Sequence, residues 1–381
     1  MIGWEYPPKN SGGLGVACQG IVEHLSDAGQ EVLLVLPSGE TEKQIKMLRT
    51  RLGKFYPVLF LPSNIRAYPE SLPEKYAGNL IEDVYLFARD VEEAVRGEVF
   101  DLVHVHDWLT VPAGIAVSDH FKKPLIMHVH STEFDRTAGG EPNYAVSQIE
   151  QLGFHEADLI VAVSGYTKKL LISEYHVPQE KIKVVYNGVE KNSMSGQQEA
   201  DFLGTAPVVL FVGRLTIQKG ADNFIRLAKK VLESRSDAIF VIAGDGDMYR
   251  YLVEYSAFAE VTGSVLFSGF LRDLDINKLY QRAQVLVMPS VSEPFGLVAL
   301  EAASWGVPVI VSKTSGVAEV LPSAIQVDYW DSGLAAKHVL DLMTETDKKT
   351  KIGEALKIEA NQLSWDIAAA KLIKIYQKMR K

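Results

Sequence analysis

Short runs of apolar, often β-branched residues alternate along the chain with segments in which apolar residues recur at helical spacing. Most of the runs are continuous rather than alternating, which is typical of parallel strands covered on both faces. Strands are therefore predicted at 31–36, 57–61, 102–105, 125–129, 159–163 and 183–186, and again at 208–212, 239–243, 265–268, 285–288, 307–311 and 325–327. Helical segments between most of these strands predict successive βαβ units.

The βαβ series runs twice. The dipeptide Asn187-Gly188 interrupts it, and the polar stretch 190–204 that follows is typical of a linker. A chain of 381 residues is also long for a single core. We therefore expect an α/β protein with two doubly wound, Rossmann-like parallel-sheet domains, at 1–190 and 191–363. Segment 364–381 predicts a last helix, capped by Ser364.

Other segments fit the series less well. Residues 39–54 and 62–78 are polar with Pro or Gly, and they are expected to form an irregular insertion that shapes an acceptor site. Six residues precede Pro7-Pro8, and only about three of them precede the turn expected around the two prolines, fewer than the five or six of an ordinary strand. Either the first strand is a stub, or the true start lies upstream of Met1.

Composition narrows the class of protein. The formal net charge of −9 disfavours a nucleic-acid binder, whose affinity depends on Lys and Arg. Cys18 is the single cysteine, so no intrachain disulfide can form, and a reducing cytoplasm fits. No apolar run approaches the roughly 18 residues of a membrane span, and the first residues lack the features of a signal peptide. A cytoplasmic protein is predicted.

A glycine-rich turn, Ser11-Gly12-Gly13-Leu14-Gly15, stands directly before a helical pattern. Its glycines allow close approach of a ligand to the backbone, and the helix N-terminus attracts anions. A plain tight turn is the alternative. A dinucleotide fingerprint would need glycine where Cys18 stands, so NAD is not expected.

Two cations follow the first strand of the second series, in Gly213-Arg214-Leu215-Thr216-Ile217-Gln218-Lys219-Gly220. Ligands of open α/β sheets bind at the carboxyl ends of strands. Arg214 and Lys219 there would suit a diphosphate. Two solvated charges are the alternative, but a cation near a helix N-terminus is unfavourable without an anionic partner.

Two carboxylates lie eight residues apart in the segment from Ser292 to Glu301. Pro294 favours an early helical position, and the helix is expected to run to about Trp305. Glu293 and Glu301, about two turns apart, could then face one cleft and accept hydrogen bonds from sugar hydroxyls. The N–H groups of Gly296 and Leu297 could meet phosphate oxygens. Surface roles for both glutamates are equally compatible with the spacing.

Histidines occur in pairs at two predicted strand ends. His128 and His130 share one face of a strand, as do His104 and His106. No third metal ligand is evident, so His128 is interpreted as a satisfied core histidine and His130 as the site candidate. The Asp-x-Asp strings at 245–247 and 273–275 are interpreted as structural. No metal and no cofactor is expected.

Together these residues resemble glycosyltransferase family 4 over nearly the whole chain. The motifs that occur in the family's order are Pro7-Pro8 with Gly12-Gly13-Leu14-Gly15, His106-Asp107-Trp108, His130 to Arg136, Val163-Ser164, Asn187-Gly188-Val189, Gly213-Arg214-Leu215 with Lys219-Gly220, and Glu293 to Glu301. The resemblance implies the GT-B fold, with two domains facing a central cleft and the last helix packed back on the first domain. It also implies metal-independent transfer that retains anomeric configuration, with an acceptor-side first domain and a nucleotide-sugar-binding second domain.

The resemblance also implies roles for residues. Arg214 and Lys219 would bind the donor diphosphate, Glu301 the ribose and Glu293 the donor sugar, with His130 at the reaction centre. Backbone groups would assist the binding of the donor, at Gly12, Gly13, Gly15, Gly296 and Leu297.

Within the family the chain is most similar to glycogen and starch synthases, through Trp4-Glu5-Tyr6-Pro7-Pro8 and His106-Asp107-Trp108. Bacterial glycogen synthases typically have Lys-Thr-Gly-Gly-Leu in the first loop and usually lack the glutamate that Glu301 supplies. The donor, ADP-glucose or a UDP-sugar, therefore stays open. A hexose, glucose first, moved to a carbohydrate acceptor is the leading hypothesis. Transfer to a lipid-linked or lipopolysaccharide acceptor, with peripheral membrane contact, and a sugar-nucleotide epimerase or binder are the alternatives.

Overall fold

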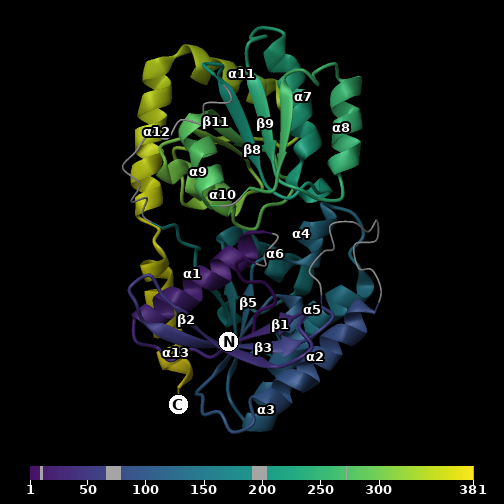
Figure 1. The fold of residues 1–381 in the computed structure, drawn as a ribbon, viewed down its shortest axis with the longest axis vertical. Helices are drawn as coiled ribbons and strands as arrows, with labels where there is room; N and C mark the ends of the chain where they lie inside the picture. The colour runs from purple at the N-terminus through teal and green to yellow at the C-terminus, as the bar shows by residue number, and fades with distance from the viewer. Residues whose placement is uncertain (9–11, 66–78, 191–203, 272, 381) are drawn as a thin grey trace. The chain divides into compact units, whose positions relative to one another are not determined.

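The computed structural model describes residues 1–8, 12–65, 79–190, 204–271 and 273–380 (Figure 1). The chain divides into two compact units. Unit 1 comprises Met1–Gly188 with Ser364–Lys381, and unit 2 comprises Val189–Leu363. Most of the predicted linker at 190–204, most of the predicted insertion segment at 62–78, and Ser11 lie outside the described residues.

The sheet of unit 1 is parallel except at one edge. Its strands are β1 (Leu34–Ser38), β2 (Gln44–Arg49), β3 (Phe55–Pro62), β4 (Val103–His106), β5 (Leu125–Val129), β6 (Leu159–Ala162) and β7 (Ile182–Val184). Two groups, β1-β3-β2 and β4-β5-β6-β7, are joined by Ile2, which makes parallel bridges to Val35 and to Val105. Ile2 thereby links the two groups of strands into one sheet.

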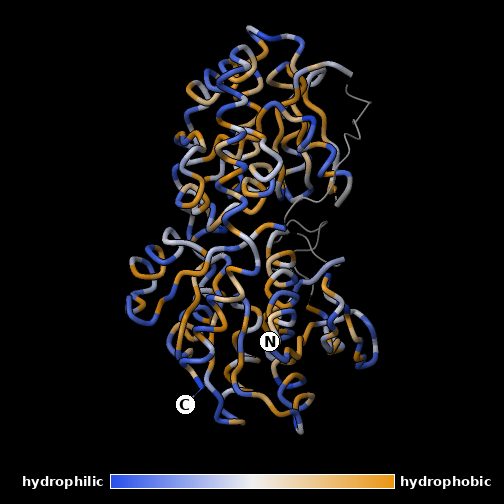
Figure 2. Tube along the Cα trace, turned by 90° about the vertical axis from the view of Figure 1, so that its left-hand side faces the viewer, coloured by the Kyte–Doolittle hydropathy of each residue, from blue (hydrophilic) through white to orange (hydrophobic). Residues whose placement is uncertain are grey.

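Period-two alternation places the side chains of unit 1 on two faces of this sheet. Val35, Leu59 and Leu61 join the core cluster that includes residues of α2 and α3, whereas Leu34 and Leu36 pack with Cys18 and Val22 of α1. The helices are α1 (Gly13–Asp27), α2 (Leu80–Ala94), α3 (Val111–Phe121), α4 (Glu133–Thr137), α5 (Tyr144–Glu156), α6 (Gly165–Tyr175) and α13 (Trp365–Met379). In Figure 2 hydrophobic positions concentrate inside each unit.

Helix α13 packs against α1, within unit 1. A Cβ at Gly20 would lie 2.4 Å from the indole of Trp365, so a glycine is needed for this close approach. The helix lies within the predicted residues and has Ser364 at its N-cap, as predicted, but the Ser364 side chain makes no capping hydrogen bond.

The expectation of an irregular insertion at 39–54 is also wrong. Strand β2 lies there, antiparallel to β3 with Gln44 opposite Phe60. It is an edge strand that buries neither face, and its side chains are exposed or half-buried throughout. Because neither face is buried, the strand has no continuous apolar run, and the alternation of Ile45 and Met47 with Gln44 and Lys46 is the one signal that could have indicated it. Each strand that was predicted from the sequence overlaps a strand of the structure.

Unit 2 contains a parallel sheet in the order β10-β9-β8-β11-β12-β13. Its strands are β8 (Val208–Val212), β9 (Ile239–Ala243), β10 (Val265–Gly269), β11 (Ala283–Met288), β12 (Val309–Ser312) and β13 (Ile325–Val327). Its helices are α7 (Ala221–Leu232), α8 (Tyr249–Phe258), α9 (Asp273–Arg282), α10 (Leu297–Ser304), α11 (Ser332–Thr344) and α12 (Thr346–Asn361). Helices α7, α8 and α11 contribute to one core cluster, and α10 packs against α12 (Figure 1).

Candidate functional site

The strand order of unit 2 reverses direction between β8 and β11. The chain first moves outward from β8 to β9 and β10, and then returns to place β11 on the other side of β8. Loops that follow two such strands diverge to opposite faces of the sheet and leave room for a ligand at the carboxyl ends. The loops after β8 (213–220) and β11 (289–296) are therefore the first place to look for a site.

Backbone contacts hold these two loops together. The N–H of Val291 donates to the carbonyl oxygen of Gln218 at 2.9 Å, and the Gln218 side chain donates to the carbonyl of Ser292 at 3.2 Å. Gly220, with φ +65°, adopts a left-handed conformation, and a Cβ there would lie 2.1 Å from the carbonyl oxygen of Pro289. The sequence thus supplies a glycine where the loops cross most closely.

An ion pair joins the two loops at their side chains. Lys219 Nζ lies 2.7 Å from Glu293 Oε2, and the hydroxyl of Ser290 donates to the same oxygen at 3.1 Å. Glu293 is buried and Lys219 is partly buried. Lys219 and Glu293, 74 positions apart in the chain, are therefore in direct contact. Arg214 is also partly buried and lies two residues after the end of β8.

Glu293 lies in extended backbone rather than at the start of a helix. Its N–H donates to Thr314 at 3.0 Å, its carbonyl accepts from Gly316 at 2.9 Å, and it forms a parallel bridge to Ser315. These bonds to the loop after β12 prevent a helix from beginning at Pro294. The expected helix is present as α10, but it begins at Leu297 rather than near Pro294 and ends at Ser304. Glu293 lies before this helix and Glu301 within it, as predicted, but the two carboxylates are not separated by two helical turns.

Helix α10 offers backbone donors at its N-terminus. Its N-cap is Gly296 with φ +107°, which has no side chain to cap the helix. Among the described residues, the N–H groups of Gly296 and Leu297 have no hydrogen-bond acceptor. Unpaired N–H groups at a helix N-terminus form a site for an anion.

Glu301 lies within α10 and is half-buried. Tyr280 donates a hydrogen bond to its carboxylate at 2.9 Å. Burial raises the pKa of Glu301 to about 7, and the hydrogen bond from Tyr280 opposes this rise. The carboxylate therefore changes its charge near neutral pH. Tyr280 could not be found from spacing, because α9 brings it to α10 only in the tertiary structure.

In unit 1 four histidines gather on the sheet face opposite the main core cluster. His104 and His106 come from β4, whereas His128 and His130 come from the end of β5, where His106 pairs with His128. Ring centroids lie 4.4 Å apart for His128 and His130 and 4.7 Å apart for His104 and His106, with interplanar angles of 20° and 17°. The four imidazoles therefore form a stack.

Hydrogen bonds satisfy only part of this stack. His106 Nδ1 lies 2.9 Å from His130 Nε2, and His104 Nδ1 lies 2.6 Å from the hydroxyl of Tyr376 on α13. Both nitrogens of His128, and Nε2 of His104 and His106, are buried without a partner among the described residues. The interpretation of His128 as a satisfied core histidine is therefore wrong, because the register that buries it supplies no acceptor or donor.

Three of these histidines, His104, His106 and His128, offer nitrogens within 4.8 Å of one another. No third ligand could be predicted from the sequence, because the register between β4 and β5 is a property of the sheet. Imidazoles that share one metal ion direct in-plane lone pairs at a common point, as tetrahedral zinc sites require. The nearly parallel rings here do not converge in that way. Burial lowers the pKa of each ring, and that of His130 falls to about 3, so the stack is neutral at pH 7.

Asp107 holds the backbone of His130. Its Oδ1 accepts from the N–H of His130 at 2.7 Å and from that of Ser131 at 3.3 Å. Asp107 has φ +58°, which is rare for a residue other than glycine. Burial raises the pKa of its carboxyl to about 7, although Arg136 and the two N–H groups oppose the rise. A strained, buried aspartate therefore positions His130.

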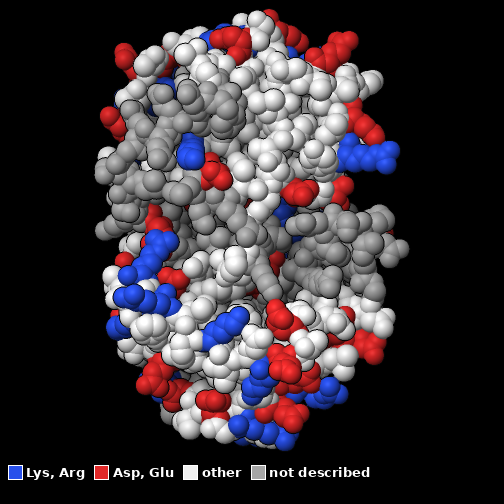
Figure 3. Space-filling view, in the orientation of Figure 1, with Lys and Arg blue, Asp and Glu red and all other residues white. Residues whose placement is uncertain are grey.

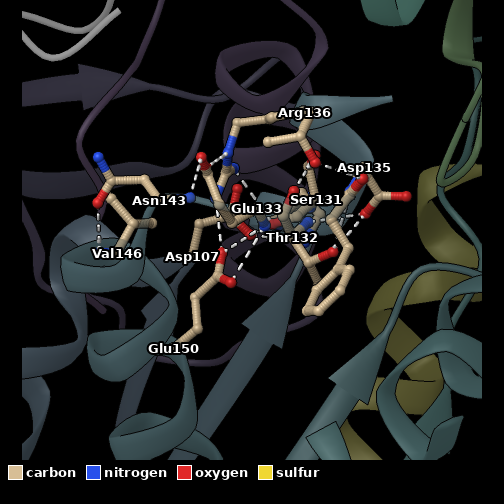
Figure 4. A network of polar contacts seen from close by, with 12 residues as sticks. Asp107, Ser131, Thr132, Glu133, Asp135, Arg136, Asn143, Val146 and Glu150 are labelled. Atoms are coloured by element: carbon tan, nitrogen blue, oxygen red, sulfur yellow. Dashed lines mark hydrogen bonds and ion pairs between the residues drawn. The ribbon is translucent and has the colours of Figure 1, made fainter. Parts of the chain in front are cut away.

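A buried polar network lies beside this loop (Figure 4). The guanidinium of Arg136 donates to Glu133 at 3.0 Å and to Glu150 at 2.6 Å, and all three side chains are buried. The N–H of Glu133 donates to both oxygens of Glu150, and Tyr175 also contacts Glu150. The network ties α4 to α5 and so fixes the residues after His130. Glu150 and Tyr175 carried no signal in the sequence.

The glycines of the first loop lie at the start of α1. Gly12 is its N-cap, Gly13 is its first residue, and Gly15 is buried in its first turn. Gly12, Gly13, Gly15 and His130 thus belong to unit 1, whereas Arg214, Lys219, Glu293, Gly296, Leu297 and Glu301 belong to unit 2.

Comparison with known families matches almost the whole chain. Residues 11–193 match the family described as Glycosyltransferase Family 4, and residues 197–358 match Glycosyl transferases group 1. An uncharacterised glycosyltransferase of Methanocaldococcus jannaschii is 34% identical over 341 residues, which cover 84% of this chain and 82% of that protein. A glycogen synthase of Mycobacterium tuberculosis is 27% identical over 334 residues, covering 84% and 79%.

Solved structures share the fold. A sucrose-phosphate synthase from Thermosynechococcus elongatus matches with a TM-score of 0.84 at 18% identity and covers 99% of this chain and 98% of that one. The catalytic domain of starch synthase IV from Arabidopsis thaliana, bound to ADP and acarbose, matches with a TM-score of 0.73 at 17% identity and covers 99% and 98%. With its two parallel-sheet units and these relatives, the chain belongs to glycosyltransferase family 4 and has the GT-B fold.

Proposed function

We propose that this glycosyltransferase moves a hexose, most simply glucose, from a nucleotide-diphosphate sugar to a carbohydrate acceptor, with retention of anomeric configuration and without a metal. The observation that carries the proposal is the contact between Lys219 and Glu293 at the switch point of unit 2. Near it stand the unpaired N–H groups of Gly296 and Leu297. One unit thus offers a cation, a carboxylate and backbone donors at the strand ends where ligands bind.

The ion pair suggests how the site responds to a donor. Without a ligand, Glu293 neutralises Lys219 at 2.7 Å. A diphosphate carries more negative charge than one carboxylate, so it would compete for the ammonium and leave Glu293 to accept hydrogen bonds from sugar hydroxyls. Arg214 and the N-terminus of α10 would share the diphosphate charge. These groups would stabilise the negative charge that develops as the diphosphate departs.

Glu301 and His130 complete the proposed assignments. An ionised Glu301 would accept hydrogen bonds from the ribose hydroxyls. His130 would act as a neutral imidazole beside the donor sugar, because its pKa of about 3 keeps it uncharged at pH 7. Retention would follow if the acceptor attacks from the face that the diphosphate leaves. No carboxylate is assigned as a covalent nucleophile.

The relatives support this substrate class without selecting the donor base. The starch synthase was solved with ADP, and a related protein of Anabaena, HepE, was solved with UDP and glucose (19% identity, TM-score 0.74). We therefore propose ADP-glucose and UDP-glucose as the first two donors to test. Maltooligosaccharides are the first acceptors, because glycogen and starch synthases are among the relatives.

The test is a panel of sugar nucleotides with maltooligosaccharide, monosaccharide and lipid-linked acceptors, with release of nucleoside diphosphate followed with and without EDTA. The proposal expects a glycosylated product, with the anomeric configuration of the donor and an unchanged rate in EDTA. An epimerised sugar nucleotide without transfer would refute it, and activity abolished by EDTA would refute metal independence.

A further inference from the structure

The hairpin formed by residues 43–55, called the basic hairpin below, exposes an unusual set of side chains. It contains β2, the turn after it and the first residue of β3. Within the part of the chain that the structure describes, β2 pairs only with β3 and so lies at an edge of the sheet. Four large apolar side chains are exposed on it, with 63% of Ile45, 57% of Met47, 79% of Leu52 and 61% of Phe55 accessible.

The basic hairpin is positively charged, whereas the chain as a whole is negatively charged. Its cations are Lys43, Lys46, Arg49, Arg51 and Lys54, all exposed, and it contains no Asp or Glu. The whole chain has a formal net charge of −9. In Figure 3, Lys and Arg side chains lie over the part of unit 1 where Figure 1 draws β2, with uncharged atoms and some acidic groups beside them. Positive charge is therefore concentrated where apolar side chains are exposed.

Protection of the sheet edge explains only half of this pattern. Lysines on an edge strand do discourage pairing with other strands. Exposed Ile, Met, Leu and Phe have the opposite effect, and contiguous apolar patches usually mark a binding surface. Apolar side chains bordered by cations match the interface of a membrane, where acyl chains lie next to anionic headgroups. A surface of nucleic acid or acidic polysaccharide would account for the cations alone.

We propose that the basic hairpin docks unit 1 on the surface of a membrane that contains anionic phospholipid. Ile45, Met47 and Leu52 would enter the headgroup boundary, and the cations would contact lipid phosphates. The contact would be peripheral, because no helix among the described residues is long and apolar enough to cross a bilayer. This proposal does not depend on the donor site, and its test contains no sugar nucleotide.

The experiment is co-sedimentation of the full chain with vesicles of phosphatidylcholine alone, and of phosphatidylcholine with about one third phosphatidylglycerol. We expect binding to the anionic vesicles only, and weaker binding as salt screens the charges. Each cation near such a surface contributes about a fivefold factor in affinity. The Lys43→Glu/Arg49→Glu variant, at positions on the same face of the hairpin as Ile45 and Met47, should therefore bind at least about 25-fold more weakly. The Ile45→Ser/Met47→Ser/Leu52→Ser variant should also lose binding, although its charge is unchanged.

The matched control is Lys351→Glu/Lys357→Glu, which changes the net charge equally at two exposed positions of α12 in unit 2. It should bind like the unaltered chain. Circular dichroism and the urea midpoint check that each variant is folded. Absence of binding to anionic vesicles, or equal loss in the control, would overturn the proposal. Competition by heparin together with full binding by the serine variant would instead identify a polyanion as the partner and also overturn it.

Discussion

Replacement of Lys219 by alanine tests the proposed site most directly, because the structure allows separate estimates for stability and turnover. The ammonium lies 2.7 Å from Glu293. At an effective dielectric constant of about 20, this separation corresponds to roughly 6 kcal/mol of attraction, before the cost of removing both groups from water. After that cost, a hydrogen bond between charged groups is worth about 1.5–3 kcal/mol. Without Lys219, the buried Glu293 carboxylate keeps the Ser290 hydroxyl as its partner. We expect Lys219→Ala to lower the free energy of unfolding by about 2 kcal/mol.

The turnover of Lys219→Ala should fall by more than its loss of folding stability alone would cause. Loss of one preorganised charge at a departing diphosphate lowers turnover by at least about 100-fold, or about 2.7 kcal/mol. The double variant Lys219→Met/Glu293→Gln separates the two effects. It leaves no unpaired charge, so its free energy of unfolding should return to within about 1 kcal/mol of that of the unaltered chain, while turnover stays low.

The assays are urea unfolding and release of nucleoside diphosphate at saturating donor and acceptor, at one temperature and ionic strength. Turnover of Lys219→Ala within tenfold of the unaltered chain would contradict the electrostatic role. Recovery of turnover together with stability in the double variant would show that the lysine acts only through folding.

Three further predictions follow from single contacts. Donor binding should strengthen as pH rises through about 7, because the raised pKa of Glu301 makes it the ionised, stronger acceptor only above that pH. Glu301→Gln should abolish this dependence of the donor KM, and Tyr280→Phe should move its midpoint upward. Gly220→Ala should lower the free energy of unfolding by at least about 2 kcal/mol, seen as a lower urea midpoint, since a Cβ would meet a backbone oxygen at 2.1 Å. Arg136→Leu should cost about 3–5 kcal/mol of stability at pH 7 and less at pH 5, where the Glu150 carboxyl is protonated; an equal loss at both pH values would contradict an electrostatic origin.

The quality of sequence prediction varied with how each element is buried. Strands such as β8 and β9 are covered on both faces, so their continuous apolar runs identified them to the residue. Strand β2 was not predicted, because an exposed edge strand has no continuous apolar run. The start of α10 was predicted three residues too early, because the hydrogen bond between Glu293 and Thr314 outweighed the local preference of Pro294 for a helix.

The fold class, the repeated βαβ series and the family could all be predicted from the amino-acid order, because they follow from local periodicity and from motifs along the chain. Which side chains meet, by contrast, depends on how distant segments pack together. The contact between Lys219 and Glu293 depends on the position of β11 beside β8, and the stack of histidines depends on the register of β4 and β5. Pairing, register and burial arise from distant segments, so a residue's partner and its pKa cannot be obtained from its neighbours in the chain.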